Sequence, residues 1–184
     1  GTTCFVSPNV DARDDLEALA AAIEGLGIRA VLARWVDSLA ALDDASEAVK
    51  RWDGAAGGRI RMRLGLEVPR LRDDPYKPEL YSAVAARAND LGCGLVYHFC
   101  SEVEDWTYYE DRFGRRPARW AEEHGILGPR TLLINGCWLS AAEAQVLAET
   151  ATPLAHSPSA NMKMASGVAP IRDLRDAGVT VALG

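Results

Sequence analysis

Side chains that could bind a metal or move protons follow three predicted strands of this chain. His98, Asn135 and His156 each come directly after an apolar run, and Glu102 lies four residues after His98. Imidazole is the commonest ligand of divalent metals, and a carboxylate nearby can carry protons to and from a metal-bound water. The remaining histidine, His124, ends a predicted helix, where a cation favours the helix dipole, so we expect it to be structural.

These side chains need an alternating βα framework to position them, and the hydrophobic pattern supplies one. Seven strands are predicted, over residues 2–6, 28–36, 60–66, 95–99, 131–134, 154–156 and 179–183. Helices are predicted between them, over residues 14–26, 40–52, 80–91, 116–124, 140–147 and 171–177. Barrel enzymes carry their functional groups at the carboxyl ends of parallel strands.

We therefore expect an α/β fold, a partial (β/α)8 TIM-type barrel, since seven strands are one fewer than a closed barrel requires. At 184 residues the chain is also shorter than the roughly 250 residues of a usual complete barrel. A doubly wound open sheet is the competing architecture, which the lack of a glycine-rich phosphate loop after the first strand disfavours.

Two segments are expected on the face that carries specificity in barrels. The longest irregular stretch, Glu67–Lys77, directly follows a predicted strand and contains Asp73, Asp74 and two prolines. The segment Trp106–Phe113 follows the next strand and is rich in aromatic and acidic residues. Because loops at the carboxyl ends of strands form the substrate pocket of a barrel enzyme, Trp106 is a predicted substrate contact.

Composition excludes several classes of function. A net charge of −6 argues against a nucleic-acid partner, which needs clustered Lys and Arg. No run approaches the roughly 18 apolar residues that span a membrane, and no signal peptide is visible at the start, so no membrane partner is expected. The four cysteines form no CxxC pair, which favours a reducing, cytoplasmic setting.

The passage around His98 resembles the metal-dependent amidohydrolase superfamily, in its branch of cytosine, guanine and S-adenosylhomocysteine deaminases and triazine chlorohydrolases. The matching segments are Tyr97-His-Phe-Cys-Ser-Glu102, Phe113-Gly-Arg-Arg-Pro117 and His124-Gly-Ile-Leu. The resemblance implies that His98 binds the catalytic metal and that Glu102 is a proton shuttle. Here the interval between them is one residue longer than in the family, so that Ser101 stands where the glutamate is commonly found. Either a bulge re-aims Glu102 or another group takes its role.

Two further segments are similar to the same family. Leu132-Leu-Ile-Asn-Gly-Cys-Trp-Leu-Ser140 matches the passage of its sixth strand, with Asn135 in place of the usual catalytic histidine. Asn can donate a hydrogen bond but cannot take up a proton near neutral pH. His156-Ser-Pro-Ser-Ala-Asn161 matches the turn after the seventh strand. The resemblance implies that His156 helps to form the catalytic pocket and that Asn161 orders the loop above it, as a substrate-binding residue.

The two ends of the chain resemble interior parts of the family's barrel. Gly1-Thr-Thr-Cys-Phe5 is similar to its second strand, and Val179–Gly184 to its eighth. We therefore expect a single barrel segment over residues 1–184, lacking the first strand and the end of the last. The family's His-x-His pair and strand-eight Asp are absent here, so a divalent metal, Zn or Fe, is expected in the complete protein and weakly or not at all in this chain. Its unpaired barrel seam predicts self-association, as a homo-oligomer or an aggregate.

The leading hypothesis is thus a segment of a metal-dependent hydrolase that acts on carbon–nitrogen or carbon–halogen bonds of N-heterocyclic or amide small molecules. The chain by itself is expected to be inactive. One alternative is a non-catalytic homologue that serves as a binding or scaffold protein, which Asn135 and the shifted Glu102 favour. Another is an unrelated α/β binding domain.

Overall fold

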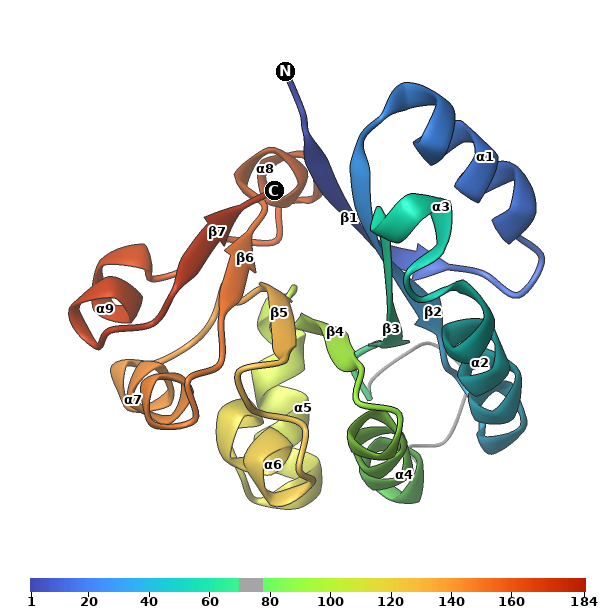
Figure 1. Ribbon diagram of the computed structural model, residues 1–184. Helices are drawn as coiled ribbons and strands as arrows, with labels where there is room; N and C mark the ends of the chain where they lie inside the picture. Colours follow the sequence, from blue (N-terminus) through green and yellow to red (C-terminus); the bar gives the residue numbers. More distant parts are fainter. Residues whose placement is uncertain (70–77) are drawn as a thin grey trace. The chain divides into compact units, whose positions relative to one another are not determined.

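The computed structural model describes residues 1–69 and 78–184, which form two compact units. The first comprises Gly1–Leu66 and Ala83–Val96, and the second Glu67–Ser82 and Tyr97–Gly184. Within the described residues the seven strands follow one another in the sheet in chain order, β1-β2-β3-β4-β5-β6-β7 (Figure 1). A doubly wound sheet reverses its strand order at a switch point, so this order excludes it. The predicted fold class, an α/β part of a (β/α)8 barrel, is confirmed.

The first unit contains three parallel strands with their connecting helices. Its elements are β1 (Cys4–Val10), α1 (Leu16–Leu26), β2 (Arg29–Trp35), α2 (Leu39–Trp52), α3 (Ala55–Gly58), β3 (Ile60–Leu66), most of α4 (Pro78–Asp90) and the start of β4 (Gly94–Phe99). β1 pairs with β2, and β2 with β3, both in parallel. The predicted strands and helices of this unit are confirmed, with ends that differ by a few residues.

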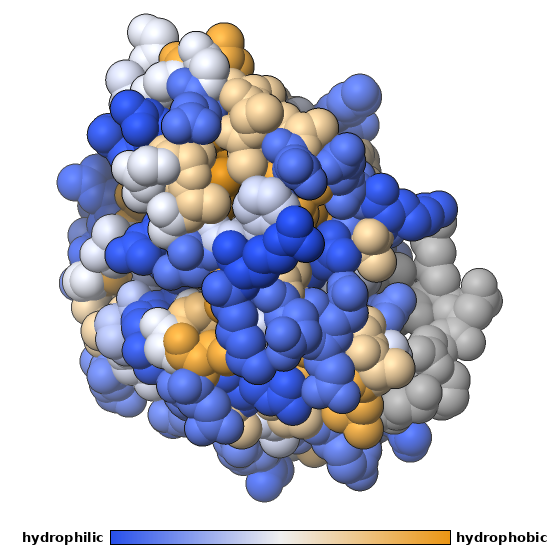
Figure 2. Space-filling model, turned by 45° about the vertical axis from the view of Figure 1, so that its right-hand side comes forward, coloured by the Kyte–Doolittle hydropathy of each residue, from blue (hydrophilic) through white to orange (hydrophobic). Residues whose placement is uncertain are grey.

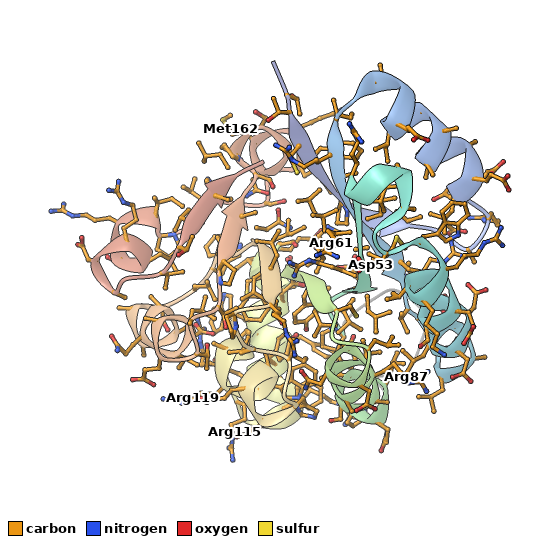
Figure 3. All side chains as sticks on the ribbon, in the orientation of Figure 1. Asp53, Arg61, Arg87, Arg115, Arg119 and Met162 are labelled. Atoms are coloured by element: carbon orange, nitrogen blue, oxygen red, sulfur yellow. The ribbon has the colours of Figure 1, made fainter. Side chains whose placement is uncertain are left out.

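Local sequence explains why these elements start and stop where they do. The Asp15 carboxylate caps α1 by accepting hydrogen bonds from two backbone N–H groups of its first turn, each at 3.0 Å. Gly27, with a φ of 67°, ends the helix in the left-handed conformation that glycine adopts without strain. After α2, Asp53 accepts from Arg61 at 3.0 Å and from the Met62 N–H at 2.8 Å, which fixes the entry into β3 (Figure 3).

The second unit contains the remaining parallel strands and the helices that cover them. Its elements are the end of β4, α5 (Val103–Phe113), α6 (Pro117–Glu123), β5 (Thr131–Asn135), α7 (Ala141–Glu149), β6 (Leu154–His156), α8 (Pro158–Met164), α9 (Ile171–Asp176) and β7 (Val181–Leu183). β5 pairs with β6, and β6 with β7, in parallel. α6 contacts α5 and α7, and α7 contacts α9, so these helices form one layer beside the strands (Figure 1).

Two segments of this unit are more helical than the sequence indicated. Trp106–Phe113, interpreted as a loop, lies inside α5, and the predicted turn after His156 is the helix α8. Pro158 occupies the first turn of α8. Proline has no backbone N–H, but none is needed there, because the first N–H groups of a helix have no partner within the helix. Turn-forming residue types therefore start a helix here.

An aromatic cluster fills the core beneath α5 and α6. Tyr97, Tyr109 and Trp120 are each at most 2% exposed, and the rings of Tyr109 and Trp120 meet edge to face with centroids 5.2 Å apart. Burial raises the pKa of both tyrosines well above the usual value, so their hydroxyls stay protonated and hydrogen-bond to each other at 2.5 Å. This cluster anchors β4 and thereby the residues at its end.

The described surface is mixed and largely polar. Figure 2 shows one face, on which hydrophilic residues predominate and hydrophobic ones form small groups. Arg115, just before α6, and Arg119, on α6, point away from the strands and pair with two acidic residues of this helix, Glu123 and Glu122 (Figure 3). None of the described helices is long and apolar enough to cross a membrane.

Candidate functional site

His98, the predicted metal ligand, lies near the carboxyl end of β4 and is held by a carboxylate. Its Nδ1 atom is 3.0 Å from Oε2 of Glu67, and the two side chains are 18% and 21% exposed. The pair is therefore mostly shielded from water, yet still reachable from the surface. Glu67 thus engages the Nδ1 side of the imidazole ring. A carboxylate on the second nitrogen of a ligating histidine is the usual arrangement in metal sites.

Glu67 itself is fixed by two more hydrogen bonds, and sequence reasoning did not single it out. Its Oε1 accepts from the N–H of Val68 at 3.0 Å, and its backbone carbonyl accepts from the Tyr81 hydroxyl at 2.8 Å. Glu67 is the first residue after β3, so the strand-end rule that selected His98 applies to it as well. The predicted specificity loop Glu67–Lys77 starts at this residue, and its part 70–77 lies outside the described residues.

Asn135, at the end of β5, contacts Ser101 in the turn that follows β4. Its Nδ2 donates to Oγ of Ser101 at 2.7 Å. The two turns are tied together by backbone bonds from Gly136 N–H to the Phe99 carbonyl, 2.7 Å, and from Cys137 N–H to the Cys100 carbonyl, 2.9 Å. Thus the structure brings together the two positions at which this chain departs from its family resemblance.

The backbone of these turns explains the longer interval between His98 and Glu102. Cys100 has a φ of +48° and Asn135 a φ of +80°. A left-handed non-glycine residue is uncommon, and asparagine tolerates it best. Glu102 is the N-cap residue of α5, and the buried Asp105 carboxylate accepts from the N–H groups of Ser101 and Glu102 at 2.8 and 2.9 Å. Ser101 is thus the residue that faces Asn135, and a shuttle role for Glu102 stays a prediction.

His156, at the end of β6, shares a buried amide with a cysteine. The Nδ2 atom of Asn161 in α8 donates to Sγ of Cys137 at 3.0 Å and lies 3.5 Å from Nδ1 of His156. All three residues are at most 6% exposed. Burial raises the pKa of the Cys137 thiol to about 11, with a smaller contribution from the negative charge of Asp105. The thiol is therefore protonated at neutral pH and acts here as a hydrogen-bond acceptor, not as a nucleophile.

Trp106 lies on α5 beneath the guanidinium of Arg116, which is 4.8 Å from the centre of its ring. The same guanidinium donates to Oε2 of the buried Glu143 from Nε and Nη2, at 3.0 and 2.7 Å, and to the Trp138 carbonyl at 3.0 Å. Glu143 also closes the capping box of α7 with Ser140. Two sequence motifs far apart in the chain thus meet in one charge-assisted network, and contact of Trp106 with a substrate stays a prediction.

The loop after α8 contacts Trp138 through a hydrogen bond and close packing. Its indole N–H donates to the Ser166 carbonyl at 2.7 Å, and a Cβ at Gly167 would lie 2.9 Å from the indole ring. With a φ of +118°, Gly167 also has a backbone conformation that other residues rarely adopt. This glycine therefore allows the loop to lie flat on the ring.

Side-chain contacts link the predicted residues in three sets: His98 with Glu67, Asn135 with Ser101, and His156 with Asn161 and Cys137. Over residues 1–69 and 78–184, no three His, Cys, Asp or Glu side chains are placed so that they could hold a metal ion. A stable mononuclear site needs three or four protein ligands. The described residues therefore offer one predicted ligand, His98, with its supporting carboxylate.

Known proteins resemble this chain both in sequence and in structure. The chain is 33% identical over 178 residues to a 5-methylthioadenosine/S-adenosylhomocysteine deaminase of Natronomonas pharaonis, covering 92% of this chain and 40% of that protein. It superposes on the zinc-complexed atrazine chlorohydrolase of Arthrobacter aurescens TC1 with a TM-score of 0.77 at 26% identity, over 98% of this chain and 43% of the other. An adenosine deaminase from Xanthomonas campestris with bound zinc shares the fold, with a TM-score of 0.85 at 21% identity over 100% of this chain and 42% of the other.

The chain thus spans about two fifths of the length of the relatives that it matches. The sequence model of the Amidohydrolase family matches this chain over residues 1–184. This match excludes an unrelated α/β binding domain and agrees with the strand order and the strand-end histidines. The chain belongs to the amidohydrolase family.

Proposed function

We propose that this chain is part of a metal-dependent hydrolase that replaces an exocyclic substituent of an N-heterocyclic small molecule by the oxygen of water. The observation that carries the proposal is the contact of His98 with Glu67 at 3.0 Å, near the end of β4. Family membership supports it, as do the relatives named as deaminases and the structural relative named as a chlorohydrolase.

Zinc or iron is the metal that we propose for the complete protein, and the zinc complexes among the structural relatives support a divalent metal. Such a metal, when bound, would supply a water of lowered pKa as the nucleophile. His98 would be one ligand, and Glu67 would fix its orientation. The other ligands would come from residues outside those described, since these contain no three-donor group.

The other strand-end residues would bind and orient the substrate. The Asn135 amide and the Ser101 hydroxyl offer hydrogen bonds to ring nitrogens or to the substituent. Asn161 would keep His156 in place beside the pocket, and Trp106 would offer an aromatic face to the ring. For Glu102, the N-cap residue of α5, we propose proton transfer. The reaction would take place in the cytoplasm, which the free cysteines support.

A non-catalytic homologue is the second candidate. It is favoured by the Ser101–Asn135 pair, which has no group that titrates near neutral pH, and by the lack of three grouped metal ligands in the described chain. Such a protein would bind the same class of heterocycle without converting it.

The test is metal analysis of the intact protein, followed by a screen of aminated and halogenated purines, pyrimidines and triazines with and without a chelator. About one equivalent of metal and a chelator-sensitive release of ammonia or halide would support the hydrolase. His98→Asn should lower both the metal content and the turnover. A metal-free protein that binds a heterocycle without turnover would favour the second candidate.

A further inference from the structure

The turn after β5 contains Asn135–Gly136, the only asparagine of the sequence that precedes a glycine. The other three asparagines, Asn9, Asn89 and Asn161, precede Val, Asp and Met. Asparagine before glycine is chemically labile, because no side chain on the following residue hinders attack by its backbone nitrogen on the asparagine side chain. A reactive dipeptide therefore stands at the end of a strand whose last residue belongs to the candidate site.

The backbone of this turn requires both residues of the dipeptide. Asn135 has a φ of +80° and Gly136 a φ of +63°. Asparagine is among the few non-glycine residues that tolerate this left-handed conformation. At Gly136, a Cβ would collide with the side chain of Leu154 in β6, so no larger residue fits there. The labile pair is thus a consequence of how the turn is built.

The reaction open to such a pair is deamidation. The backbone nitrogen of Gly136 loses its proton and attacks Cγ of Asn135, so that a nitrogen–carbon bond forms. The bond from Cγ to Nδ2 breaks, and Nδ2 takes up a proton and leaves as ammonia. Water then opens the resulting succinimide ring at either of its two carbonyls, which gives aspartate or isoaspartate. Water is the only co-reactant.

Both reacting atoms are engaged in the folded chain. The N–H of Gly136 donates to the carbonyl of Phe99 at 2.7 Å, and Nδ2 of Asn135 donates to Oγ of Ser101 at 2.7 Å. Phe99 ends β4, the neighbour of β5 in the sheet (Figure 1). Ser101 is itself held, because its N–H donates to the buried Asp105 carboxylate at 2.8 Å. Ring closure therefore requires the breaking of two hydrogen bonds whose acceptors are fixed.

We propose that Asn135–Gly136 is a site of spontaneous deamidation, which the bonds to Phe99 and Ser101 keep closed in the folded protein and which opening of this turn releases. The protective role of Ser101 is independent of the proposed function. Deamidation changes the candidate site itself. An aspartate adds a negative charge beside Ser101, whose N–H already binds the Asp105 carboxylate, and an isoaspartate lengthens the main chain by one atom at the end of β5.

The test follows all four asparagines by peptide mapping and mass spectrometry. The intact protein is kept at mildly alkaline pH, which speeds the reaction because the attacking nitrogen must lose its proton, with and without guanidinium chloride. In the unfolded protein, Asn135 should react fastest of the four. In the folded protein, Asn135 should react at least about tenfold more slowly than in the unfolded protein, because two hydrogen bonds must break together.

A single substitution isolates the contribution of Ser101. Ser101→Ala removes the acceptor of Asn135 Nδ2 and should speed deamidation at Asn135 in the folded protein about 5-fold, the factor that one hydrogen bond of ordinary strength contributes. The exposed Asn89 and the buried Asn161 are internal references, and both should keep their rates. Ser82→Ala, at an exposed position of α4, is the matched control and should leave all four rates unchanged.

Two outcomes would overturn the proposal. One is an equal rate at Asn135 in the folded and the unfolded protein, since the fold then gives no protection. The other is a rate in Ser101→Ala that equals the parent's. If Ser101→Ala unfolds, which a faster reaction at Asn161 would reveal, Ser101→Thr takes its place: it keeps the hydroxyl and should react at the parent's rate, and a rate at Asn135 as fast as in the unfolded protein would contradict the proposal. None of these measurements involves turnover, so the proposed function stands or falls separately.

Discussion

Replacing Glu67 by alanine tests whether the carboxylate positions His98. The change removes the acceptor of His98 Nδ1 and of the Val68 N–H, both at 3.0 Å. Hydrogen bonds to charged groups contribute about 1.5–3 kcal/mol, and leaving a buried donor unpaired adds to the loss. Since both side chains are about one-fifth exposed, hydrogen bonds to water replace part of the lost stabilisation. We expect a loss of about 1–2 kcal/mol in the free energy of unfolding.

A double-mutant cycle isolates the contact. Glu67→Ala, His98→Ala and the double variant are unfolded in urea, and we expect a coupling energy of about 1 kcal/mol. Glu79→Ala, at an exposed site in the first turn of α4, is the control and should change stability by less than about 0.5 kcal/mol. In the intact protein, metal affinity measured by chelator competition should fall about 10–100-fold in Glu67→Ala. A coupling energy below about 0.3 kcal/mol together with unchanged metal affinity would refute the positioning role.

Three further predictions concern stability. Arg116→Ala leaves the carboxylate of Glu143, which is 2% exposed, without its cation and should cost about 2–4 kcal/mol in urea unfolding, whereas a loss under about 1 kcal/mol would show that the network is not coupled. Gly167→Ala should lower the melting temperature, because its Cβ would meet an indole ring at 2.9 Å and its φ is +118°; the control Gly25→Ala, in the last turn of α1 with no atom within 4 Å of the added Cβ, should instead leave stability unchanged or raise it by up to about 0.5 kcal/mol. Burial raises the pKa of the Cys137 thiol from its usual 9.0 to about 11, so the folded chain keeps this proton to a higher pH than the unfolded chain does. The free energy of unfolding should therefore fall between about pH 9 and 11, by at most about 1.4 kcal/mol per pH unit relative to Cys137→Ala, and equal slopes in the two proteins would contradict the shift.

The strand-end rule accounts for the part of the site that could be predicted from the sequence. His98 and His156 lie in the last residues of β4 and β6, and Asn135 ends β5, as expected, because a parallel α/β framework sends the carboxyl ends of its strands to one edge. Glu67 satisfies the same rule after β3, but it stands at the start of a long irregular stretch and was grouped with it. The rule finds positions, and it does not tell which of several polar neighbours faces inward.

Local backbone conformation determines two features of the site that could not be predicted from the sequence. The register of Ser101 and Glu102 depends on Cys100, whose φ of +48° has no signal in the sequence, because cysteine is not a residue that marks left-handed turns. The turn after His156 is a helix because Pro158 fits a first helical turn as well as it fits a bend. In the turn after β4, the bonds from the N–H groups of Gly136 and Cys137 hold the backbone in this conformation.

The two departures from the family resemblance are therefore one structural feature. Seen in the sequence, a serine near a shifted glutamate and an asparagine on another strand are separate changes, 34 residues apart. In the structure they share a 2.7 Å hydrogen bond, and backbone bonds hold both turns in place. A hydroxyl and an amide satisfy each other at this distance, whereas an amide beside an apolar residue would leave a half-buried donor unpaired. The bond between Ser101 and Asn135 therefore joins two turns that are far apart in the sequence into one structural unit.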